Sequence, residues 1–386
     1  MGNRITAIVI TNLCLLALTA CGPQPVKQQS EMDTPEHHVS SGYKYLNAGK
    51  YDDAFREFDR ARQLDPKFSP AFVGLGLTAA YQQSYEDALE FMNTAKKTAK
   101  GDAQTYDVPV GFMRIYYMGQ AQIDDNWLRK VRGYYHDAIA VSEDRPDAYY
   151  FMGLAYKVSY EFRKSVIEFT RVLDIGKGYM AEADLEYKLV QKIERAMPGT
   201  TVGKRIALLE AITRADLAAL FIEELKIDDL YRRKAKRTFD TGFKAPGQAA
   251  AGATGPALPA DITTHVLKAD IEAVIAMGIK GLQPFPDGTF KPDTNVTRAE
   301  YAMIIEDILI TITGDASLAT QFIGNRSPFP DLRSDLPYFN AVMVCTSRGI
   351  LEAVDVGTGE FKPTGLISGA DALLSIRALK SQVNQY

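Results

Sequence analysis

The strongest constraint on the fold is a motif that occurs twice near the C-terminus with one internal spacing. Each copy begins with Gly-Ile, at Gly278 and at Gly349, and carries Phe-Lys-Pro in its middle. Each ends with a hydroxyl residue, Thr297 or Ser368, which an acidic residue follows three positions later. The glycine and the hydroxyl residue are 19 positions apart in both copies. Shared residues in a shared register indicate an internal repeat.

The last four residues of the motif predict the start of a helix. In Thr297-Arg298-Ala299-Glu300 the threonine can cap the N3 amide while the glutamate reaches back to the N-cap amide, which is a capping box. Ser368-Gly369-Ala370-Asp371 keeps this cap without the arginine. A third box, Thr213-Arg214-Ala215-Asp216, lies upstream. We therefore expect three related helices in the C-terminal part.

On these residues the chain resembles S-layer homology repeats, at about 198–228, 261–313 and 329–383. The resemblance implies a pseudo-threefold helical bundle that binds an acidic, often pyruvylated, cell-wall polysaccharide. By the same resemblance Arg214 and Arg298 face the sugar, and Asp287 and Gly288 of the Asp-Gly loop join them as polysaccharide-binding residues. Because capping does not explain the arginines, we expect ligand contacts there. The alternative is a surface ion pair with Asp287 or Asp293.

The N-terminal half has a different period. Gly42, Gly76, Gly119 and Gly153 are 34, 43 and 34 positions apart, and small residues recur 12 and 19 positions after each. This resembles the tetratricopeptide pattern, in which small residues let paired helices approach. We predict a solenoid of helical hairpins over 41–197, with nine extra residues forming a loop near 100–110. The overall expectation is a mainly α chain, a hairpin solenoid followed by the helical bundle.

Such a solenoid commonly binds a peptide or a partner's helix on its concave face. Candidate partner-binding residues are the tyrosines on the first helices of the third and fourth hairpins, and packing between repeats is the alternative for each. They are Tyr116, Tyr117, Tyr149 and Tyr150.

The N-terminus predicts an exported lipoprotein. Residues 1–20 have an apolar run too short to span a bilayer and end before Cys21 in a pattern that resembles a bacterial lipobox. Lipid on Cys21, with Gly22 after it, favours the outer membrane facing the periplasm. The N-myristoylation pattern beginning at Gly2 is the weaker alternative. We expect residues 21–40 to form a flexible tether.

The insert at 229–260 combines a basic run with a Gly/Ala/Pro-rich stretch. The basic run indicates a solvated helix end, with contact to an acidic polymer or to lipid headgroups as the alternative, and the second stretch indicates a linker. A net charge of −4 gives no general attraction to nucleic acid, and we expect none as a partner. No catalytic motif or metal-ligand spacing stands out among the four histidines and three cysteines. We therefore expect no enzyme activity, no cofactor and no metal.

These patterns together predict a non-catalytic outer-membrane lipoprotein. Its S-layer homology repeats would bind a wall polymer, acidic or linked to peptidoglycan, and its hairpins would recruit a protein. The alternative is a scaffold or assembly factor of an outer-membrane or export complex, in which the repeats are only structural.

Overall fold

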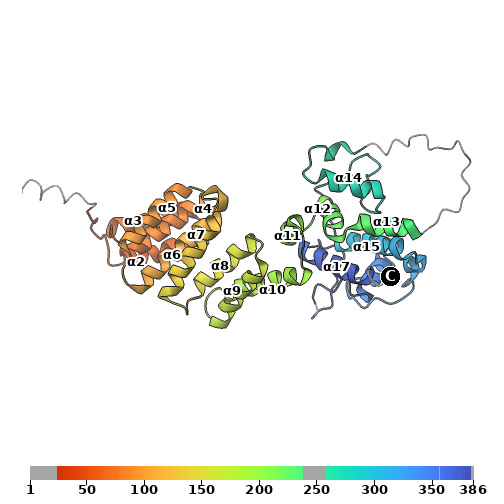
Figure 1. Ribbon diagram of the computed structural model, residues 1–386. Helices are drawn as coiled ribbons and strands as arrows, with labels where there is room; N and C mark the ends of the chain where they lie inside the picture. The colour runs from red at the N-terminus through yellow and green to blue at the C-terminus, as the bar shows by residue number, and fades with distance from the viewer. Residues whose placement is uncertain (1–23, 238–257, 356, 384–386) are drawn as a thin grey trace, which may run out of the picture. The chain divides into compact units, whose positions relative to one another are not determined.

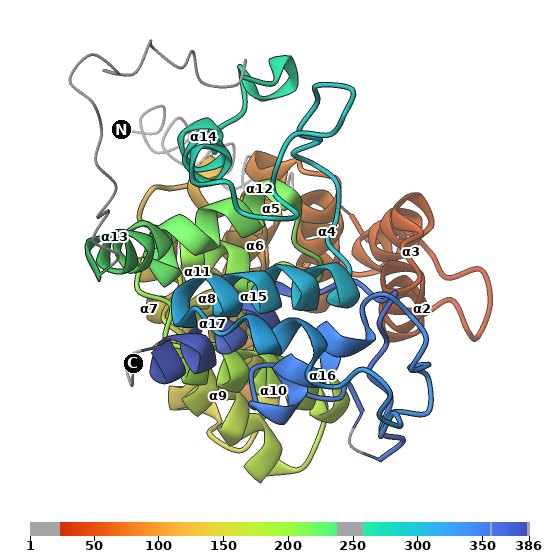
Figure 2. The same cartoon turned by 90° about the vertical axis from the view of Figure 1, so that its right-hand side faces the viewer.

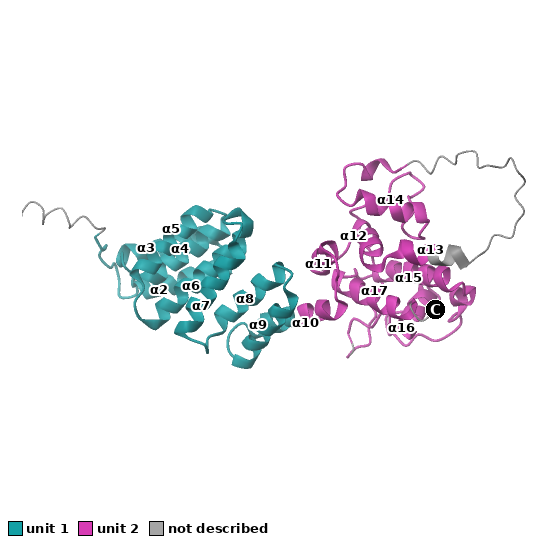
Figure 3. Ribbon diagram, in the orientation of Figure 1, with its two compact units in different colours: residues 1–187 teal, residues 188–386 magenta. Residues whose placement is uncertain are grey.

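The computed structural model describes residues 24–237, 258–355 and 357–383. Within these ranges the chain is mainly α-helical and forms no strand, which confirms the predicted fold class. It divides into two compact units, residues 1–187 and 188–386, and α10 (Met180–Ala196) crosses the boundary (Figure 3). The predicted boundary lay ten residues later, at 197/198. No helix in the described ranges is long and apolar enough to cross a lipid bilayer.

Unit 1 is a series of antiparallel helical hairpins (Figure 1). The pairs are α2 with α3, α4 with α5, α6 with α7, and α8 with α9. Their bounds are α2 Pro35–Asn47, α3 Tyr51–Leu64, α4 Ser69–Tyr81, α5 Tyr85–Thr98, α6 Gly101–Gly119, α7 Trp127–Val141, α8 Pro146–Val158 and α9 Phe162–Ile175, with a short 3₁₀ turn, η1 Gln120–Gln122, before α7.

The predicted register of the second helices is confirmed. All eight small residues that recur at the two spacings are fully buried, because each lies where a neighbouring helix approaches: Ala54, Ala61, Ala88, Ala95, Val131, Ala138, Ser165 and Val172. A Cβ on Gly42 would lie 2.6 Å from the Phe58 ring, and one on Gly153 would lie 2.7 Å from the Phe169 ring. Glycine is therefore needed at both positions.

The prediction for the third hairpin is wrong in two respects. The expected loop near 100–110 is the first half of α6, which has Pro109 inside it. Gly119 is not the packing glycine either, since a Cβ there would meet Ile123 of the following turn. Gly111 packs against Met92 as Gly74 packs against Phe58. If Gly111 is matched to Gly74, much of the nine-residue insertion lies after Gly111. There the end of α6 and the 3₁₀ turn η1 lengthen the chain before α7 begins.

The predicted tether is also too long, because α2 starts at Pro35 with Thr34 as its N-cap. The residues before α2 contact α3. The Val26 amide donates to the Gln63 carbonyl at 2.8 Å, and the Asp33 carboxylate pairs with Arg60. Cys21 and the residues before it lie outside the described ranges.

Unit 2 is built from short helices joined by loops (Figure 1). The basic run begins on a helix, α13, and most of the Gly/Ala/Pro stretch lies outside the described residues. Besides the C-terminal half of α10, the elements are α11 Thr201–Ala207, α12 Arg214–Ala219, the π-helical turn η2 Leu220–Leu225, α13 Ile227–Arg237, η3 Ala260–Ile262, α14 Lys268–Met277, α15 Arg298–Thr313, η4 Ala316–Thr320, α16 Phe339–Ser347 and α17 Gly369–Val383.

Three equivalent residues close a ring at the centre of unit 2. Ile212, Val296 and Ile367 each precede a capping residue, and all three are buried. The amide of Ile212 donates to the Ile367 carbonyl, that of Ile367 to Val296, and that of Val296 to Ile212, at 3.0–3.1 Å. Each repeat thus donates one hydrogen bond and accepts one. This cycle is the physical basis of the pseudo-threefold bundle.

The capping boxes predicted at Thr213 and Thr297 are both formed. Ser368 also caps α17, because its hydroxyl accepts from the Asp371 amide at 3.1 Å. Helices α15 and α17 lie side by side (Figure 2), where the buried Tyr301 hydroxyl donates to the Ala372 carbonyl at 3.1 Å. The caps fix where each helix begins and therefore where its N1 side chain starts.

Candidate functional site: the clefts between repeats

The two N1 arginines link each repeat to the next one. From α12, Arg214 donates to three carbonyls of the second repeat: Nε to Phe290 at 2.9 Å, Nη1 to Gly281 at 2.5 Å and Nη2 to Gln283 at 3.1 Å. Each guanidinium nitrogen of Arg214 therefore has a backbone partner in the neighbouring repeat.

Arg298 does the same from α15 to the third repeat. Its Nε donates to the Phe361 carbonyl at 2.8 Å and its Nη2 to the Glu352 carbonyl at 2.6 Å. The guanidinium also stacks on the Phe361 ring, 4.6 Å from the ring centre. Among the described residues, Asp287 contacts Lys291 at 3.4 Å and Asp293 contacts His265 at 3.7 Å, and neither aspartate pairs with Arg214 or Arg298. The ion-pair alternative is therefore wrong, because backbone carbonyls fill that role.

Two aspartates that sequence reasoning missed hold the same loops from the other side. The Asp261 carboxylate accepts from the amides of Phe290 and Lys291, and Asp331 accepts from those of Phe361 and Lys362. Lys291 and Lys362 need this support because both have positive φ, 57° and 54°. The sequence signal that could have identified them is an aspartate about 30 residues before each Phe-Lys-Pro. The amide of each phenylalanine thus meets an aspartate while its carbonyl meets an arginine.

The junction between the third repeat and the first has no N1 arginine, because backbone atoms fill the place of that side chain. The Gly369 amide donates to the Leu209 carbonyl at 2.9 Å. A Cβ on Gly369 would lie only 1.7 Å from the carbonyl oxygen of Ile206. The end of α11 therefore occupies the space that an N1 side chain takes in the other repeats. The missing arginine does not show that a junction tolerates its loss.

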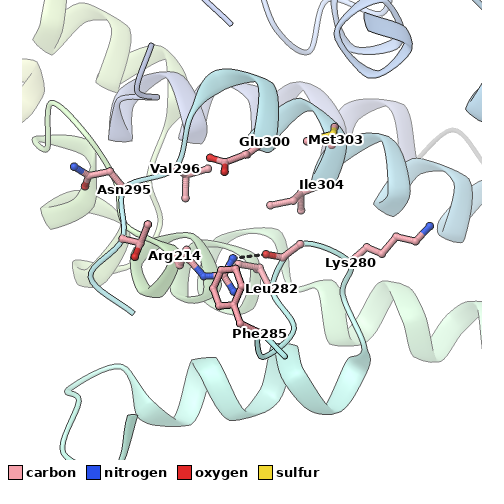
Figure 4. Close-up of a pocket in the computed structure, with 11 residues that line it drawn as sticks. Arg214, Lys280, Leu282, Phe285, Asn295, Val296, Glu300, Met303 and Ile304 are labelled. Carbon is pink, nitrogen blue, oxygen red and sulfur yellow. Dashed lines mark hydrogen bonds between the residues drawn. The ribbon is translucent and has the colours of Figure 1, made fainter. Parts of the chain in front are cut away.

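The first cleft lies over Arg214 and has a volume of about 380 Å³. Figure 4 shows Glu300, Met303 and Ile304 projecting from α15 on one side, with Arg214, Leu282 and Phe285 opposite. Its only charged side chains are Arg214, Lys280 and Glu300; Lys280 pairs with Asp307 at 3.1 Å. We call it the Arg214 cleft, and its walls are mainly apolar.

The second cleft lies over Arg298, has a volume of about 530 Å³ and occupies the equivalent place one repeat later. Residues 351–353 replace 280–282, and Asp371 replaces Glu300. We call it the Arg298 cleft. It differs in charge, since its lining carries four cations and two carboxylates: Lys192, Arg195, Arg298, Arg377, Glu352 and Asp371.

Burial disfavours the charged form of both arginines. It lowers the pKa of Arg214 and of Arg298, and nearby carboxylates offset the effect only in part. Arg298 is 4% exposed and forms no salt bridge with the residues that the structure describes. Its Nη1 has no hydrogen-bond partner in the described part of the chain, and it is not among the buried unsatisfied atoms. The Arg298 cleft therefore has an accessible donor of a buried cation at its floor.

Asp287 and Gly288 line neither cleft. Asp287 accepts from the amide and the hydroxyl of Thr289, which stabilises the turn and lowers the pKa of Asp287. Gly288 has φ 78°, which this turn requires. The structure gives both residues a role in the loop.

The four tyrosines of unit 1 separate into two pairs. Tyr116 and Tyr149 are buried, at 8% and 7% exposure; Tyr116 stacks near Tyr134, and the Tyr149 hydroxyl donates to the Glu143 carbonyl. Both therefore serve packing inside unit 1, Tyr116 within its hairpin and Tyr149 also against Tyr135 of the preceding hairpin. Tyr117 and Tyr150 are half-buried and remain accessible.

Comparison with known proteins finds a match for the second and third repeats. Residues 261–302 and 328–373 match the S-layer homology domain, and the matched segments exclude Arg214 and α10. Over 174 residues the chain is 30% identical to cell surface glycoprotein 1 of Acetivibrio thermocellus. That match covers 44% of this chain and 6% of the relative.

Proposed function

We propose that unit 2 binds a cell-wall polymer at the clefts between its repeats and so attaches the protein to the cell envelope. The two S-layer homology segments support this proposal, as does the similarity to a cell surface glycoprotein. The observation that carries it is Arg298, a buried cation that has no carboxylate partner in the described ranges and lines a cleft of about 530 Å³.

The chemistry of the clefts suits a glycan. Two hydrogen bonds fix the Arg298 guanidinium before any ligand arrives, which reduces the entropy lost on binding. The aliphatic walls contributed by Leu351 and Leu374 can contact the C–H face of a sugar ring. A charged donor beside such a wall recognises a polar substituent on that ring.

Co-sedimentation of the full chain with purified wall sacculi tests the proposal. Sacculi that keep their attached polymer should pellet the protein, and sacculi stripped of that polymer should not. Equal sedimentation with both preparations, or with neither, would refute polymer binding.

A scaffold role is the second candidate, and one observation favours it for the first junction. Each of the three Arg214 nitrogens donates to a backbone carbonyl, so holding the loop explains this side chain without a ligand. If the scaffold role is correct, disrupting either cleft will alter stability and leave sedimentation with sacculi unchanged.

The lipid anchor belongs to the same proposal. Lipid on Cys21 would hold the chain at the outer membrane, facing the periplasm. Mass spectrometry of the mature N-terminus tests it: diacylated Cys21 supports the anchor, and an unmodified N-terminus beyond residue 21 excludes it.

The hairpins of unit 1 would recruit a protein through their accessible aromatic face. This role is supported by two accessible tyrosines, Tyr117 and Tyr150, and by Arg114, whose guanidinium lies 5.0 Å from the centre of the Phe151 ring. Tyr117→Ala with Tyr150→Ala should release a co-purifying partner. Replacing the buried Tyr116 by alanine should weaken binding only by destabilising unit 1. A partner retained by the folded double variant would exclude this face.

A further inference from the structure

Unit 1 contains a pocket between α5, α6 and α7, and α6 packs against both of the other helices (Figure 1). Its floor is α6, which contributes Val108, Pro109 and Phe112. One wall is Ala99 at the end of α5, and the other is Tyr134 of α7. The pocket has a volume of about 300 Å³, and neither tyrosine of the accessible aromatic face lines it. We call it the α6 pocket.

The pocket exists because α6 begins early. Four residues join α3 to α4 and α7 to α8, whereas only residues 99–100 join α5 to α6. Helix α4 starts five residues before its packing glycine, Gly74, and α6 starts ten residues before the equivalent Gly111. The five extra residues carry α6 about 7.5 Å further along its axis. This extension brings Thr105 to the pocket, and the short connector leaves the pocket open beside it.

Pro109 leaves a hydrogen-bond acceptor of α6 without its helical donor. The prolines of α2, α4 and α8 lie in the first turn of each helix, where no helical hydrogen bond is lost. Pro109 lies inside α6, and because it has no N–H the Thr105 carbonyl lacks the donor that a helix ordinarily supplies. Thr105 and Pro109 both line the pocket, so a bound group can supply the missing donor.

The apolar part of the pocket suits an aromatic side chain. The rings of Phe112 and Tyr134 are parallel, with an interplanar angle of 4° and centres 4.5 Å apart. A further ring can extend such a stack or pack against its edge. An apolar cavity of ~150 Å³ binds benzene, so a pocket of about 300 Å³ has room for two fused rings. Lys96 and Asp137 are exposed and line the same pocket, which therefore reaches the surface.

We propose that the α6 pocket binds a tryptophan side chain of a partner protein, with the indole N–H donating to the Thr105 carbonyl. Indole combines two fused apolar rings with a single donor, which matches the size of the pocket and its one unmet acceptor. Phenylalanine would cover the carbonyl without supplying a donor, and a covered acceptor that is left unpaired costs free energy. The site is separate from the clefts of unit 2 and from the aromatic face of unit 1, so this inference goes beyond the proposed function.

Blocked amino acids test the pocket in the full chain. Ligand-observed NMR measures the affinity for N-acetyl-tryptophanamide, for its 1-methylindole analogue, which lacks the donor, and for N-acetyl-phenylalaninamide. The tryptophan amide should bind roughly fivefold more tightly than the 1-methyl analogue, as expected for one hydrogen bond. It should also bind more tightly than the phenylalanine amide, which has one ring and no side-chain donor. Equal affinities for the three compounds, or no binding of any, would overturn the inference.

Replacing Pro109 by alanine identifies the acceptor. Alanine restores the N–H that bonds to the Thr105 carbonyl within the helix, so the preference for tryptophan over the 1-methyl analogue should disappear. Pro70→Ala, in the first turn of α4 and outside the pocket, is the matched control and should keep the preference. A preference that persisted in Pro109→Ala would come from the bulk of the methyl group, and it would overturn the assignment of the Thr105 carbonyl.

Filling the pocket locates the bound ring. Ala99→Phe adds a ring at the wall of the pocket and should weaken binding of N-acetyl-tryptophanamide at least roughly tenfold. Ala140→Phe adds the same ring at an exposed position of α7 outside the pocket, and it should bind normally. Unchanged affinity in the folded Ala99→Phe variant, or an equal loss in Ala140→Phe, would overturn the location.

Free tryptophan and indole separate a docked side chain from a captured small molecule. The blocked amide resembles a residue within a chain, so it should bind at least as tightly as either free compound. Tighter binding of free tryptophan or of indole would assign the pocket to a small molecule and overturn the docking of a partner protein.

Discussion

Replacing Arg298 by alanine should destabilise unit 2, because this side chain joins the second repeat to the third. The change removes two hydrogen bonds from a charged donor, to the carbonyls of Phe361 and Glu352. It also leaves the carbonyl of Phe361, a fully buried residue, without that donor.

The magnitude follows from opposing effects. Two hydrogen bonds to a charged group contribute about 3–6 kcal/mol together. Burial of the guanidinium without a salt bridge opposes this, as the lowered pKa of Arg298 indicates. We therefore expect a net loss of about 2–4 kcal/mol. In a unit of roughly 200 residues this lowers Tm by about 4–16 °C.

Calorimetry of the full chain measures this loss, with Trp127 fluorescence assigning the transition of unit 1. Arg298→Lys should lose nearly as much as Arg298→Ala, because an ammonium keeps the charge and cannot reproduce the planar fork. Arg326→Ala, an exposed arginine, is the control. A Tm for Arg298→Ala within about 2 °C of wild type would refute the reasoning.

Three further outcomes are expected. Gly369→Ala should lower the free energy of unfolding by at least about 2 kcal/mol in thermal melting, since its Cβ would overlap the Ile206 carbonyl. Gly133→Ala places its Cβ in open space and should not lower it, and equal effects of the two variants would contradict the packing at Gly369. Burial raises the pKa of Glu168 to about 7, above the unfolded value of 4.5. Protonation of Glu168 therefore stabilises the fold, and this stabilisation is lost as pH rises from about 4.5 to 7. Glu168→Gln should make Tm less dependent on pH over this range, and an unchanged pH dependence of Tm would refute this. Asp33→Asn should speed hydrogen exchange at the Val26 amide by loosening the segment held through Arg60, and unchanged protection would show that Arg60 does not hold it.

Local chemistry made much of the fold predictable. A capping box needs only residues within one turn, so Thr213 and Thr297 could be assigned as helix starts from the sequence. The second helices of the hairpins were equally readable, because close approach of two helices demands small residues at fixed spacing. The first helix of the third hairpin was misassigned, since the Gly119 spacing matched the pattern while Gly111 makes the contact.

The site was less predictable because its partners are distant in sequence. Arg298 reaches carbonyls 54 and 63 positions away, and a backbone carbonyl has no sequence signature. The sequence shows that the third box has Gly369 in place of an arginine, but it does not show that α11 fills the space of that side chain. Lys192 and Arg195 were missed because α10 was assigned to the solenoid and its second half lines the Arg298 cleft.

The most direct test of the central claim is a crystal structure of the full chain with a charged fragment released from its own wall polymer. We predict that the anionic group of the fragment lies in the Arg298 cleft, within hydrogen-bond distance of Arg298 Nη1 and close to Arg195 and Arg377. A fragment bound only elsewhere on the chain, with this cleft empty, would contradict the account.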